Sequence, residues 1–285
     1  MSQPLLDASV SVDYPGKPGV LRDFRLRVEP GEICALAGES GSGKSTFALA
    51  VLGLLDVKKA KIRGEILFEG SNLLGLKESA LRRVRGARIG LVPQSPLAAL
   101  NPYLRLGTHL RETWVAHQPD RRGDWKRESL TALQMAQLPG GDALLDRYPR
   151  HLSVGMAQRF QIALAILHRP RLIIADEATS ALDLITQAEI LALFRELNRS
   201  QGLGVLLISH DLASAASCCH RIGILHQGAL IEEGPMETIF RNPVHPYSRR
   251  LIASLPSVPD ILAGESAIRT ECHLGPELVT PGKSL

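Results

Sequence analysis

The chain has 285 residues, of which 45% are hydrophobic and 22% are charged, which suits one large globular domain with an extension and excludes disorder throughout. Its formal net charge of +4, from 33 basic and 29 acidic residues, is too small to indicate nucleic-acid binding by itself. We therefore expect no nucleic-acid partner. The basic run at Arg82, Arg83, Arg85 and Arg88 is interpreted as a solvated face.

The cysteines and the hydropathy pattern exclude several further classes. Four cysteines, at positions 34, 218, 219 and 272, form neither a disulfide framework nor a paired CxxC metal site, which fits a reducing compartment. The N-terminal residues do not resemble a signal peptide, and no apolar stretch approaches the roughly 20 residues that a membrane-spanning helix needs. If the protein works at a membrane, we expect it to dock onto another protein there.

The first hundred residues read mainly as strands. Before position 40, short extended segments alternate with the turn sequences "YPGKPG" and Pro30-Gly31-Glu32, a pattern that predicts antiparallel strands. Residues 33–37 form a short buried strand, which is followed by the glycine-rich "GESGSGKST" and then by an apolar helical segment, "FALAVLGLL". Two more extended segments follow, "GEILFEG" and "ARIGLVPQ".

The rest of the chain changes character twice. Residues from about 96 to 167 are helical in pattern, and beyond Pro170 two buried-strand runs, "RLIIADE" and "GVLLISH", flank a helix with an apolar period through residues 190–197. Strands that alternate with helices predict a parallel sheet in an α/β core. From about Pro256 the chain becomes loop-rich. We therefore expect one domain over residues 1–256, with a helical subdomain inserted at about 96–167, and a loosely packed extension over 257–285.

The glycine-rich stretch matches the phosphate-binding pattern GxxxxGK[ST]. Gly41 and Gly43 let successive backbone N–H groups curl around a β-phosphate, Lys44 reaches the β- and γ-oxygens, and Ser45 offers a hydroxyl to Mg²⁺. The helix that follows adds the positive end of its dipole. A glycine-rich linker is the alternative, but the strand before and the helix after favour a phosphate loop. A dinucleotide-binding fold is disfavoured, because GxGxxG would need glycine where Thr46 stands.

Two acids end the strand in "LIIADEATSALD". Asp176 is placed to hold Mg²⁺ through water, and Glu177 is placed to polarise an attacking water as general base. The plainer alternative is that both acids cap the next helix. The phosphate loop in the same chain favours the catalytic interpretation.

These motifs and their order resemble the nucleotide-binding subunits of ABC transporters over nearly all of residues 5–255. The resemblance implies an α/β fold: a P-loop NTPase (RecA-like) core with an antiparallel β subdomain and an inserted α-helical subdomain. It implies ATP and Mg²⁺ as cofactors. Tyr14 resembles the aromatic that stacks on adenine, Gln94 in "GLVPQSP" the Q-loop glutamine, Asp183 in "SALD" the D-loop aspartate, and His210 in "LLISHD" the switch histidine.

The resemblance, taken with the two motifs above, gives a set of expected site residues. The catalytic group comprises Glu177, His210 and Gln94, and the Mg²⁺ group comprises Ser45, Gln94 and Asp176. The nucleotide-binding group comprises Tyr14, Gly38, Ser40, Gly41, Gly43, Lys44, Ser45, Thr46, Ser153, Gly155 and Asp183.

The sequence "LSVGM" at 152–156 resembles the LSGGQ signature of the family, which binds the γ-phosphate of the ATP held by the other subunit. Ser153 and Gly155 are kept, and a helix is expected to begin beside the serine. Val154 departs from the pattern, because a β-branched side chain stands where glycine lets the backbone come close. Two alternatives follow: the change is tolerated, or it weakens the ATP site made with the partner's phosphate loop. The backbone φ at Val154 decides between them.

Three stretches resemble the branch of the family that serves oligopeptide, dipeptide and nickel importers. They are "SPLAALNP", "YPRHLSVGM" and "FRNPVHPYSRRLIASLP". His245 and Tyr247, in the last of these, are expected to form a turn into a helix. Members of this branch often carry a cysteine-containing tail that can hold an iron–sulfur cluster. Because only Cys272 stands in this chain's tail, we expect no cluster.

The resemblance also implies partners and a location. Expected partners are a second ATP-binding subunit, identical or homologous, two permease subunits and an extracytoplasmic solute-binding protein. The chain would lie peripherally on the cytoplasmic face of the inner membrane. One alternative is a non-transport ABC ATPase, for example an accessory subunit of a phosphonate-degrading complex. Another is a nucleotide-binding regulator without hydrolysis. Translation-factor and chromosome-type ATPases are disfavoured, because the chain has neither tandem cassettes nor a long coiled coil.

Overall fold

The computed structural model describes residues 3–55 and 59–255. Its first sheet has four strands in the order β2-β1-β4-β5, and each neighbouring pair is antiparallel. The strands are β1 (Leu6–Tyr14), β2 (Lys17–Val28), β4 (Lys61–Phe68) and β5 (Ser71–Asn72). This confirms the antiparallel strands that the first part of the sequence predicts.

The second sheet has six strands in the order β10-β9-β3-β8-β7-β6. Five of them run parallel, and β10 is antiparallel to β9. The strands are β3 (Ile33–Ala37), β6 (Ile89–Val92), β7 (Leu172–Asp176), β8 (Gly204–Ser209), β9 (Arg221–His226) and β10 (Ala229–Pro235). Every residue of β3 and β8 is buried, which is what a parallel sheet covered on both faces requires. The α/β core with a parallel sheet is therefore confirmed.

The helices follow the strands in the alternation that the sequence predicts. They are α1 (Lys44–Val51), α2 (Glu78–Val84), α3 (Leu106–His117), α4 (Trp125–Met135), α5 (Gly141–Leu145), α6 (Val154–Ile166), α7 (Leu184–Gln201), α8 (Leu212–Ala216), α9 (Met236–Arg241) and α10 (Pro246–Ala253), with 3₁₀ turns η1 (Pro119–Asp124) and η2 (Pro149–His151). Helices α3 to α6 all lie between β6 and β7 in the chain. The division into domains stays a prediction, and the expected extension over 257–285, with Cys272, lies outside the described residues.

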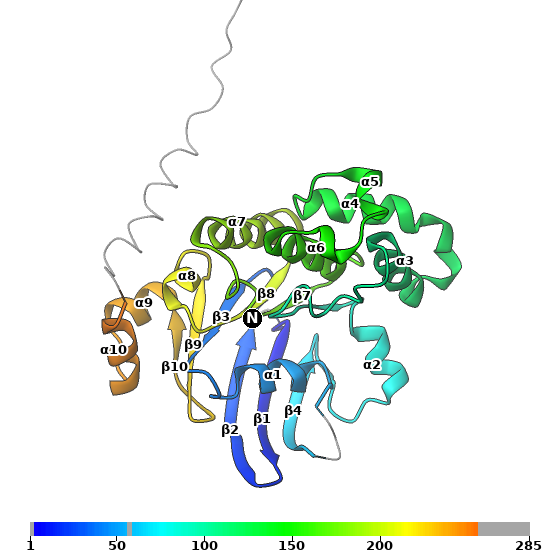
Figure 1. The fold of residues 1–285 in the computed structure, drawn as a ribbon. Coiled ribbons are helices and arrows are strands. Elements are labelled where there is room, and N and C mark those ends of the chain that lie inside the picture. Colours follow the sequence, from blue (N-terminus) through cyan, green and yellow to red (C-terminus); the bar gives the residue numbers. More distant parts are fainter. Residues whose placement is uncertain (1–2, 56–58, 256–285) are drawn as a thin grey trace, which may run out of the picture.

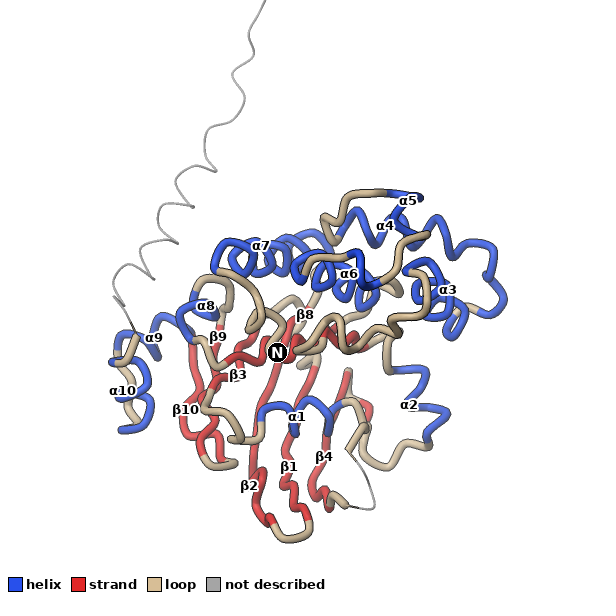
Figure 2. Tube along the Cα trace, viewed as in Figure 1, coloured by secondary structure: helices blue, strands red, loops and turns tan. Residues whose placement is uncertain are grey.

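The six-stranded sheet forms the middle layer. Alternate residues of a strand point to opposite faces, so Ile33 and Ala35 join the core under the helices, whereas Cys34 and Leu36 join the core shared with the small sheet and α1. Figure 1 shows α6 and α7 on one side of this sheet and β1, β2 and β4 with α1 on the other. The strand and helix colours of Figure 2 show the same layering. Among the described helices, none is both long and apolar enough to cross a bilayer.

One sequence interpretation was wrong. The Arg85 side chain is only 20% exposed, and it donates to the carbonyls of Leu52 at 2.5 Å and Gly53 at 2.8 Å, besides pairing with Glu78. It therefore ties α2 to the end of α1 and does not belong to a solvated face. Arg82, on the same helix, is 77% exposed and fits the interpretation. The two arginines differ in exposure because Arg85 follows the last residue of α2, where the chain turns back toward the sheet.

Candidate active site

The glycine-rich loop joins the end of β3 to the start of α1, and its backbone demands glycine at two points. Gly38 has φ of 151° and Gly43 has φ of 115°, both outside the range that other residues readily adopt. A Cβ at Gly38 would lie 2.1 Å from the carbonyl oxygen of Leu225, and one at Gly43 would lie 2.7 Å from that of Val20. The loop is therefore packed tightly against Leu225 and Val20, and it leads directly into the first turn of α1.

Lys44 and Ser42 bring polar groups to this loop. The Lys44 ammonium is buried and donates to the carbonyl oxygens of Gly38 at 2.8 Å and Glu39 at 2.9 Å. Burial lowers the pKa of Lys44, and the carboxylates of Glu177 and Asp176 oppose this. The Ser42 hydroxyl is buried and has no hydrogen-bond partner among the described residues. The Ser42 oxygen packs toward Gly38, where an added Cβ would lie 3.2 Å from it. The ammonium of Lys44 fits a phosphate group, whose oxygens accept charge-assisted hydrogen bonds.

Ser45 and Asp176 form the second part of the site. The Ser45 hydroxyl donates to Oδ1 of Asp176 at 3.0 Å, so the first turn of α1 meets the carboxyl end of β7. Burial raises the pKa of Asp176; the Ser45 hydroxyl and Lys44 counteract this, and Glu177 adds to it. Two hard oxygen donors on neighbouring elements are the kind of ligand set that Mg²⁺ prefers. The residues present therefore fit this ion.

Glu177 is the centre of the third part. Its carboxylate accepts a hydrogen bond from Nε2 of Gln94 at 2.8 Å and lies 3.5 Å from Nδ1 of His210. The three side chains follow β7, β6 and β8, whose carboxyl ends meet at one edge of the sheet. Glu177 has φ of 48° and donates its N–H to the carbonyl of Ile208 at 2.9 Å. A left-handed glutamate costs on the order of 1–3 kcal/mol, and such strain gathers at functional sites.

His210 is held in place by the start of α8. The Asp211 carboxylate accepts the backbone N–H of Ser214 at 3.2 Å as the N-cap of that helix, and it also accepts Nε2 of Gln187, on α7, at 3.0 Å. The segment that carries His210 is thereby fixed to both α7 and α8. The His210 side chain itself is 54% exposed, so it can contact a group that arrives from outside.

A separate cluster forms where α6 and α7 begin. Ser153 caps α6 by accepting the N–H of Met156 at 3.2 Å, which confirms the expected helix start. Asp183 caps α7 by accepting the N–H groups of Ile185 and Thr186, and its second oxygen accepts the Thr186 hydroxyl at 2.7 Å. The bonds from Thr186 lower the pKa of Asp183. In residues 3–55 and 59–255, no hydrogen bond joins this cluster to the phosphate loop.

The structure answers the question that Val154 raises. Val154 is the first residue of α6, is 40% exposed, and does not have a positive φ. Its backbone therefore makes no demand that only glycine meets. Gly155 is the constrained position, because a Cβ there would lie 2.8 Å from Cγ2 of Thr186. This geometry favours the alternative that valine is tolerated.

The structure also shows where three further expected site residues lie. Tyr14 ends β1 and is half-buried beside the core under the small sheet, while Ser40 is exposed on the phosphate loop and Thr46 is half-buried in α1. Their roles, like those of all the residues above, stay predictions.

Sequence reasoning missed several residues that build the site. Ser42 stands between two glycines of the loop, a position that could have been noticed. Thr186 packs against Gly155, and the buried Gln161 of α6 donates to the carbonyl of Pro96 at 2.9 Å, two residues beyond Gln94. No local sequence signal marks these last two, because each depends on a contact between distant segments.

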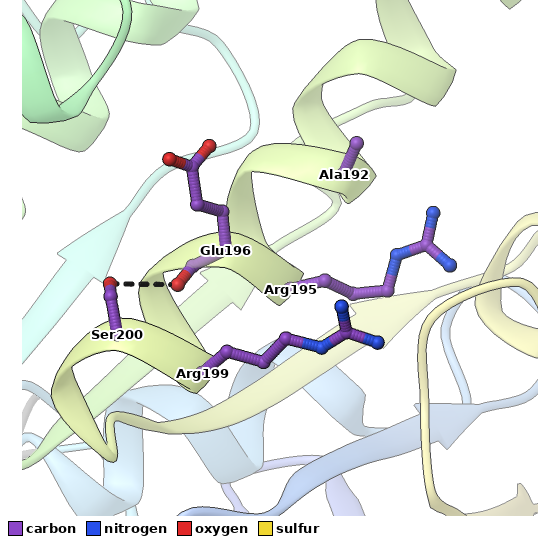
Figure 3. A pocket seen from close by; sticks show the side chains of 5 residues that line it. All are labelled: Ala192, Arg195, Glu196, Arg199 and Ser200. Carbon is purple, nitrogen blue, oxygen red and sulfur yellow. Dashed lines mark hydrogen bonds between the residues drawn. The ribbon is translucent and has the colours of Figure 1, made fainter. Parts of the chain in front are cut away.

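An open hollow of about 420 Å³ lies elsewhere, along α7 (Figure 3). Its lining comes from this one helix, where the Ser200 hydroxyl donates to the carbonyl of Glu196 at 2.8 Å, as Figure 3 shows. The lining residues are Ala192, Arg195, Glu196, Arg199 and Ser200, none of which is an expected site residue.

The parallel sheet, the glycine loop at its edge and the acids on the next strands define the chain as a P-loop nucleotide-binding protein. The ABC transporter family model matches residues 21–180. The chain belongs to the ABC transporter family.

Two transport ATP-binding proteins and one solved cassette are among the proteins that this chain resembles. The oligopeptide transport ATP-binding protein OppD of Lactococcus lactis is 37% identical over 264 residues, covering 91% of this chain and 78% of that protein. The dipeptide transport ATP-binding protein DppD of Haemophilus influenzae is 39% identical over 257 residues, covering 90% and 76%. A solved dimeric ATP-binding cassette in a post-hydrolysis state, bound to ADP and Pi, has a TM-score of 0.67 at 28% identity and covers 81% of this chain and 98% of its own.

Replacing Asp176 by asparagine should stabilise the chain in the absence of Mg²⁺. Its raised pKa means that the carboxyl binds a proton more tightly in the folded chain than in the unfolded chain. The free energy of unfolding therefore falls as the pH rises through the pKa of the folded state. At neutral pH, removing the charge should therefore raise the melting temperature. Thermal unfolding in EDTA measures the gain in stability. Thermal unfolding with Mg²⁺ and ATP measures how much of the stabilisation by these ligands the variant loses.

The matched control is Asp183→Ala. Its carboxylate caps α7 and its pKa is lowered by hydrogen bonds, so its removal should destabilise the chain under the same conditions. A lower melting temperature for Asp176→Asn would contradict the expectation.

Proposed function

We propose that this chain is the ATP-binding and ATP-hydrolysing subunit that energises an ABC importer for peptides, nickel or a related small solute. One observation carries the proposal: the Ser45–Asp176 pair and the Glu177–Gln94–His210 group stand together at the carboxyl edge of the sheet, beside the phosphate loop. The importer branch is supported by the oligopeptide and dipeptide transport relatives, which cover most of the chain. The chain takes ATP and Mg²⁺ as cofactors.

The residues around the loop bind different parts of ATP. Lys44 neutralises the β- and γ-oxygens of ATP, and the backbone N–H groups around Gly41 and Gly43 surround the β-phosphate. Ser45 and Asp176 would hold Mg²⁺, which would neutralise charge on the phosphate oxygens.

Glu177 performs the proton transfer. Its carboxylate accepts a proton from the attacking water as that water's oxygen bonds to the γ-phosphorus and the bond to the β–γ bridging oxygen breaks. Gln94 orients this carboxylate from one side, and His210 reaches the γ-phosphate oxygens from the other. The left-handed backbone of Glu177, held by Ile208, aims the side chain into the site.

A second ATP-binding subunit completes the site. Val154, Leu184 and Ile185 are exposed apolar side chains at the starts of α6 and α7, at 40%, 81% and 75% exposure. The Gly155–Thr186 contact brings these two helix starts together, so the three form one apolar face. We place the partner on this face, with Ser153 and Gly155 on its γ-phosphate and Asp183 holding the interface segment. The dimeric cassette bound to ADP and Pi supports this arrangement.

The membrane partners are assigned to the surface that follows Gln94. Leu97 and Tyr103 are exposed at 39% and 87% in the loop between β6 and α3. Two permease subunits would dock here, and an extracytoplasmic binding protein would deliver the solute. The chain would then lie peripherally on the cytoplasmic face of the inner membrane. The transport names of the relatives do not favour an accessory role in phosphonate breakdown.

Copurification tests the proposal. A tagged chain extracted with its membrane in mild detergent should carry two permease subunits with several membrane spans and a second ATP-binding subunit. The reconstituted complex should hydrolyse ATP faster when its loaded binding protein is added. Copurification with soluble phosphonate-processing enzymes in place of permeases, or a complete complex that binds ATP without hydrolysing it, would refute the assignment.

Gly155→Ala should impair the assembled ATPase. The added methyl lies 2.8 Å from Cγ2 of Thr186, so either the Thr186 side chain turns and loses its bond to Asp183, or α6 and its capping serine shift relative to α7. A displacement on the order of 1 Å at a reacting group costs roughly 10²-fold in rate, and we expect a decrease of about 10- to 100-fold. The rate of ATP hydrolysis by the complex measures it.

Thr186→Ser in the same chain provides the rescue. Serine lacks the clashing methyl but keeps the hydroxyl that bonds to Asp183. The double variant Gly155→Ala/Thr186→Ser should regain most of the lost activity. If it stays as slow as Gly155→Ala, the steric explanation fails.

A further inference from the structure

Helices α6 and α7 contact each other at two successive turns. At the first turn, a Cβ added to Gly155 of α6 would lie 2.8 Å from Cγ2 of Thr186 on α7. One turn further along each helix, Nη2 of Arg159 donates to Oε2 of Glu189 at 2.8 Å. Residues three or four positions apart share one face of a helix, so both contacts belong to the same packing surface between α6 and α7.

The end of α4 holds Arg159 from a second side. The other amino group of its guanidinium, Nη1, donates to Oε1 of Gln137 at 2.9 Å. Gln137 lies two residues after the last residue of α4, with φ of 52°, and its own Nε2 donates to Oε2 of Glu196 on α7 at 2.7 Å. One guanidinium therefore joins three helices, α4, α6 and α7.

The burial of Arg159 makes these bonds important. Its side chain is only 13% exposed, whereas that of Glu189 is 54% exposed. A charge that is mostly removed from water is costly unless it is paired and hydrogen-bonded. The planar guanidinium presents two amino groups to two different acceptors, which the single ammonium of a lysine does not reproduce. We therefore expect Arg159 to keep this one orientation.

The packing surface between α6 and α7 begins at two helix caps. Ser153 caps α6, and Asp183 caps α7. The contact at Gly155 alone is a single point, about which the two helices could tilt. The bond from Arg159, four residues on, adds a second point about 6 Å further along α6. Two points of contact fix the angle between the helices, so the spacing of the two caps depends on Arg159.

We propose that Arg159 is a positioning residue for the segment 152–156: it holds α6 against α7 and the end of α4, so that Ser153 and Asp183 keep one spacing when they meet the second subunit. This inference rests on the proposed function and adds a residue to it. In the part of the chain that the structure describes, Arg159 makes no hydrogen bond to the phosphate loop. Its effect therefore falls on hydrolysis of the ATP held by the other subunit.

Arg159→Gln tests the proposal in the assembled complex. The kcat for ATP hydrolysis should fall by about 5- to 20-fold, because a displacement of 1 Å at a reacting group costs roughly 100-fold and the start of α6 should move by less. Titration calorimetry of the full chain without its partners should show a Kd for ATP and Mg²⁺ within about twofold of the unaltered value. General damage to the fold would change both quantities.

Three further variants identify the pair as the cause. Glu189→Ala should lower kcat in the same direction, and the double variant Arg159→Gln/Glu189→Ala should be no slower than Arg159→Gln alone, as two residues that act through one contact predict. Arg159→Lys keeps the charge but should remain impaired, because it cannot hold Glu189 and Gln137 together. Arg127→Gln is the matched control, since Arg127 lies on α4 and pairs with Asp124 and Glu128 of its own segment. It should leave kcat within about twofold.

Four outcomes would overturn the inference. An unchanged kcat in Arg159→Gln would remove the residue from positioning. An equal fall in Arg127→Gln would show a general effect of charge on the helices between β6 and β7. Factors that multiply in the double variant would separate Arg159 from Glu189. A Kd of the isolated chain raised as much as kcat falls would place the effect on this chain's own ATP. Failure of the unaltered complex to hydrolyse ATP would instead refute the proposed function, so the two failures are distinguishable.

Discussion

Glu177→Gln should decrease ATP hydrolysis by the assembled complex by about 10²- to 10⁴-fold, the range that a general base contributes. The change removes the proton acceptor but keeps the size of the side chain and its ability to accept from Gln94. ATP binding should be retained, because the phosphate loop is untouched. The variant should therefore accumulate as an ATP-bound dimer, which gel filtration with and without ATP detects.

Glu196→Gln is the matched control, since Glu196 lies on α7 in the hollow away from the loop. Its hydrolysis rate should stay near that of the unaltered complex. Undiminished turnover in Glu177→Gln would remove Glu177 from the mechanism. A loss of ATP binding in the same variant would instead point to a structural role for the carboxylate.

Lys44→Met should weaken ATP binding by roughly 100-fold or more. Contacts between an ammonium and two phosphate oxygens are charge-assisted hydrogen bonds of about 1.5–3 kcal/mol each, and 2.7 kcal/mol corresponds to about 100-fold. Methionine keeps the buried stem, so the loop should still fold. Titration with ATP and Mg²⁺ measures the Kd.

Thermal unfolding without nucleotide serves as the control for folding. Because burial is the main cause of the lowered Lys44 pKa, removing the charge should leave stability unchanged or raise it. Lys77→Met, at an exposed position before α2, should alter neither the Kd for ATP nor the melting temperature. An affinity close to that of the unaltered chain would exclude Lys44 from phosphate binding.

The central part of the fold could be predicted because its signals are local. The buried run at 33–37, the glycine loop and the apolar helix stand next to each other, and β3 and α1 fall where the sequence places them. The same holds for β7, α7 and β8, each of which carries an unbroken apolar run or a clear helical period. The loop and the two acids of the site belong to these elements.

Other features depend on contacts that no local pattern encodes. The left-handed backbone of Glu177 is held by Ile208 on a neighbouring strand, and the burial of Arg85 is set by the end of α1. The φ of Val154 follows from its place in the first turn of α6. Strands β9 and β10 and helices α8 and α9 follow one another so closely that neither period is sustained, and the sequence predicted none of them.

The bond from Gln161 to Pro96 ties α6 to the segment that carries Gln94. The helix has 13 residues and so is about 20 Å long. In the proposed dimer, its first turn would face the ATP of the other subunit, while Gln161, two turns on, holds the segment next to Gln94, whose side chain bonds to Glu177. A tilt of α6 on dimer closure would then displace both ends of the helix together. Under the proposed function, α6 would therefore couple the occupancy of one ATP site to the position of Glu177 in the other.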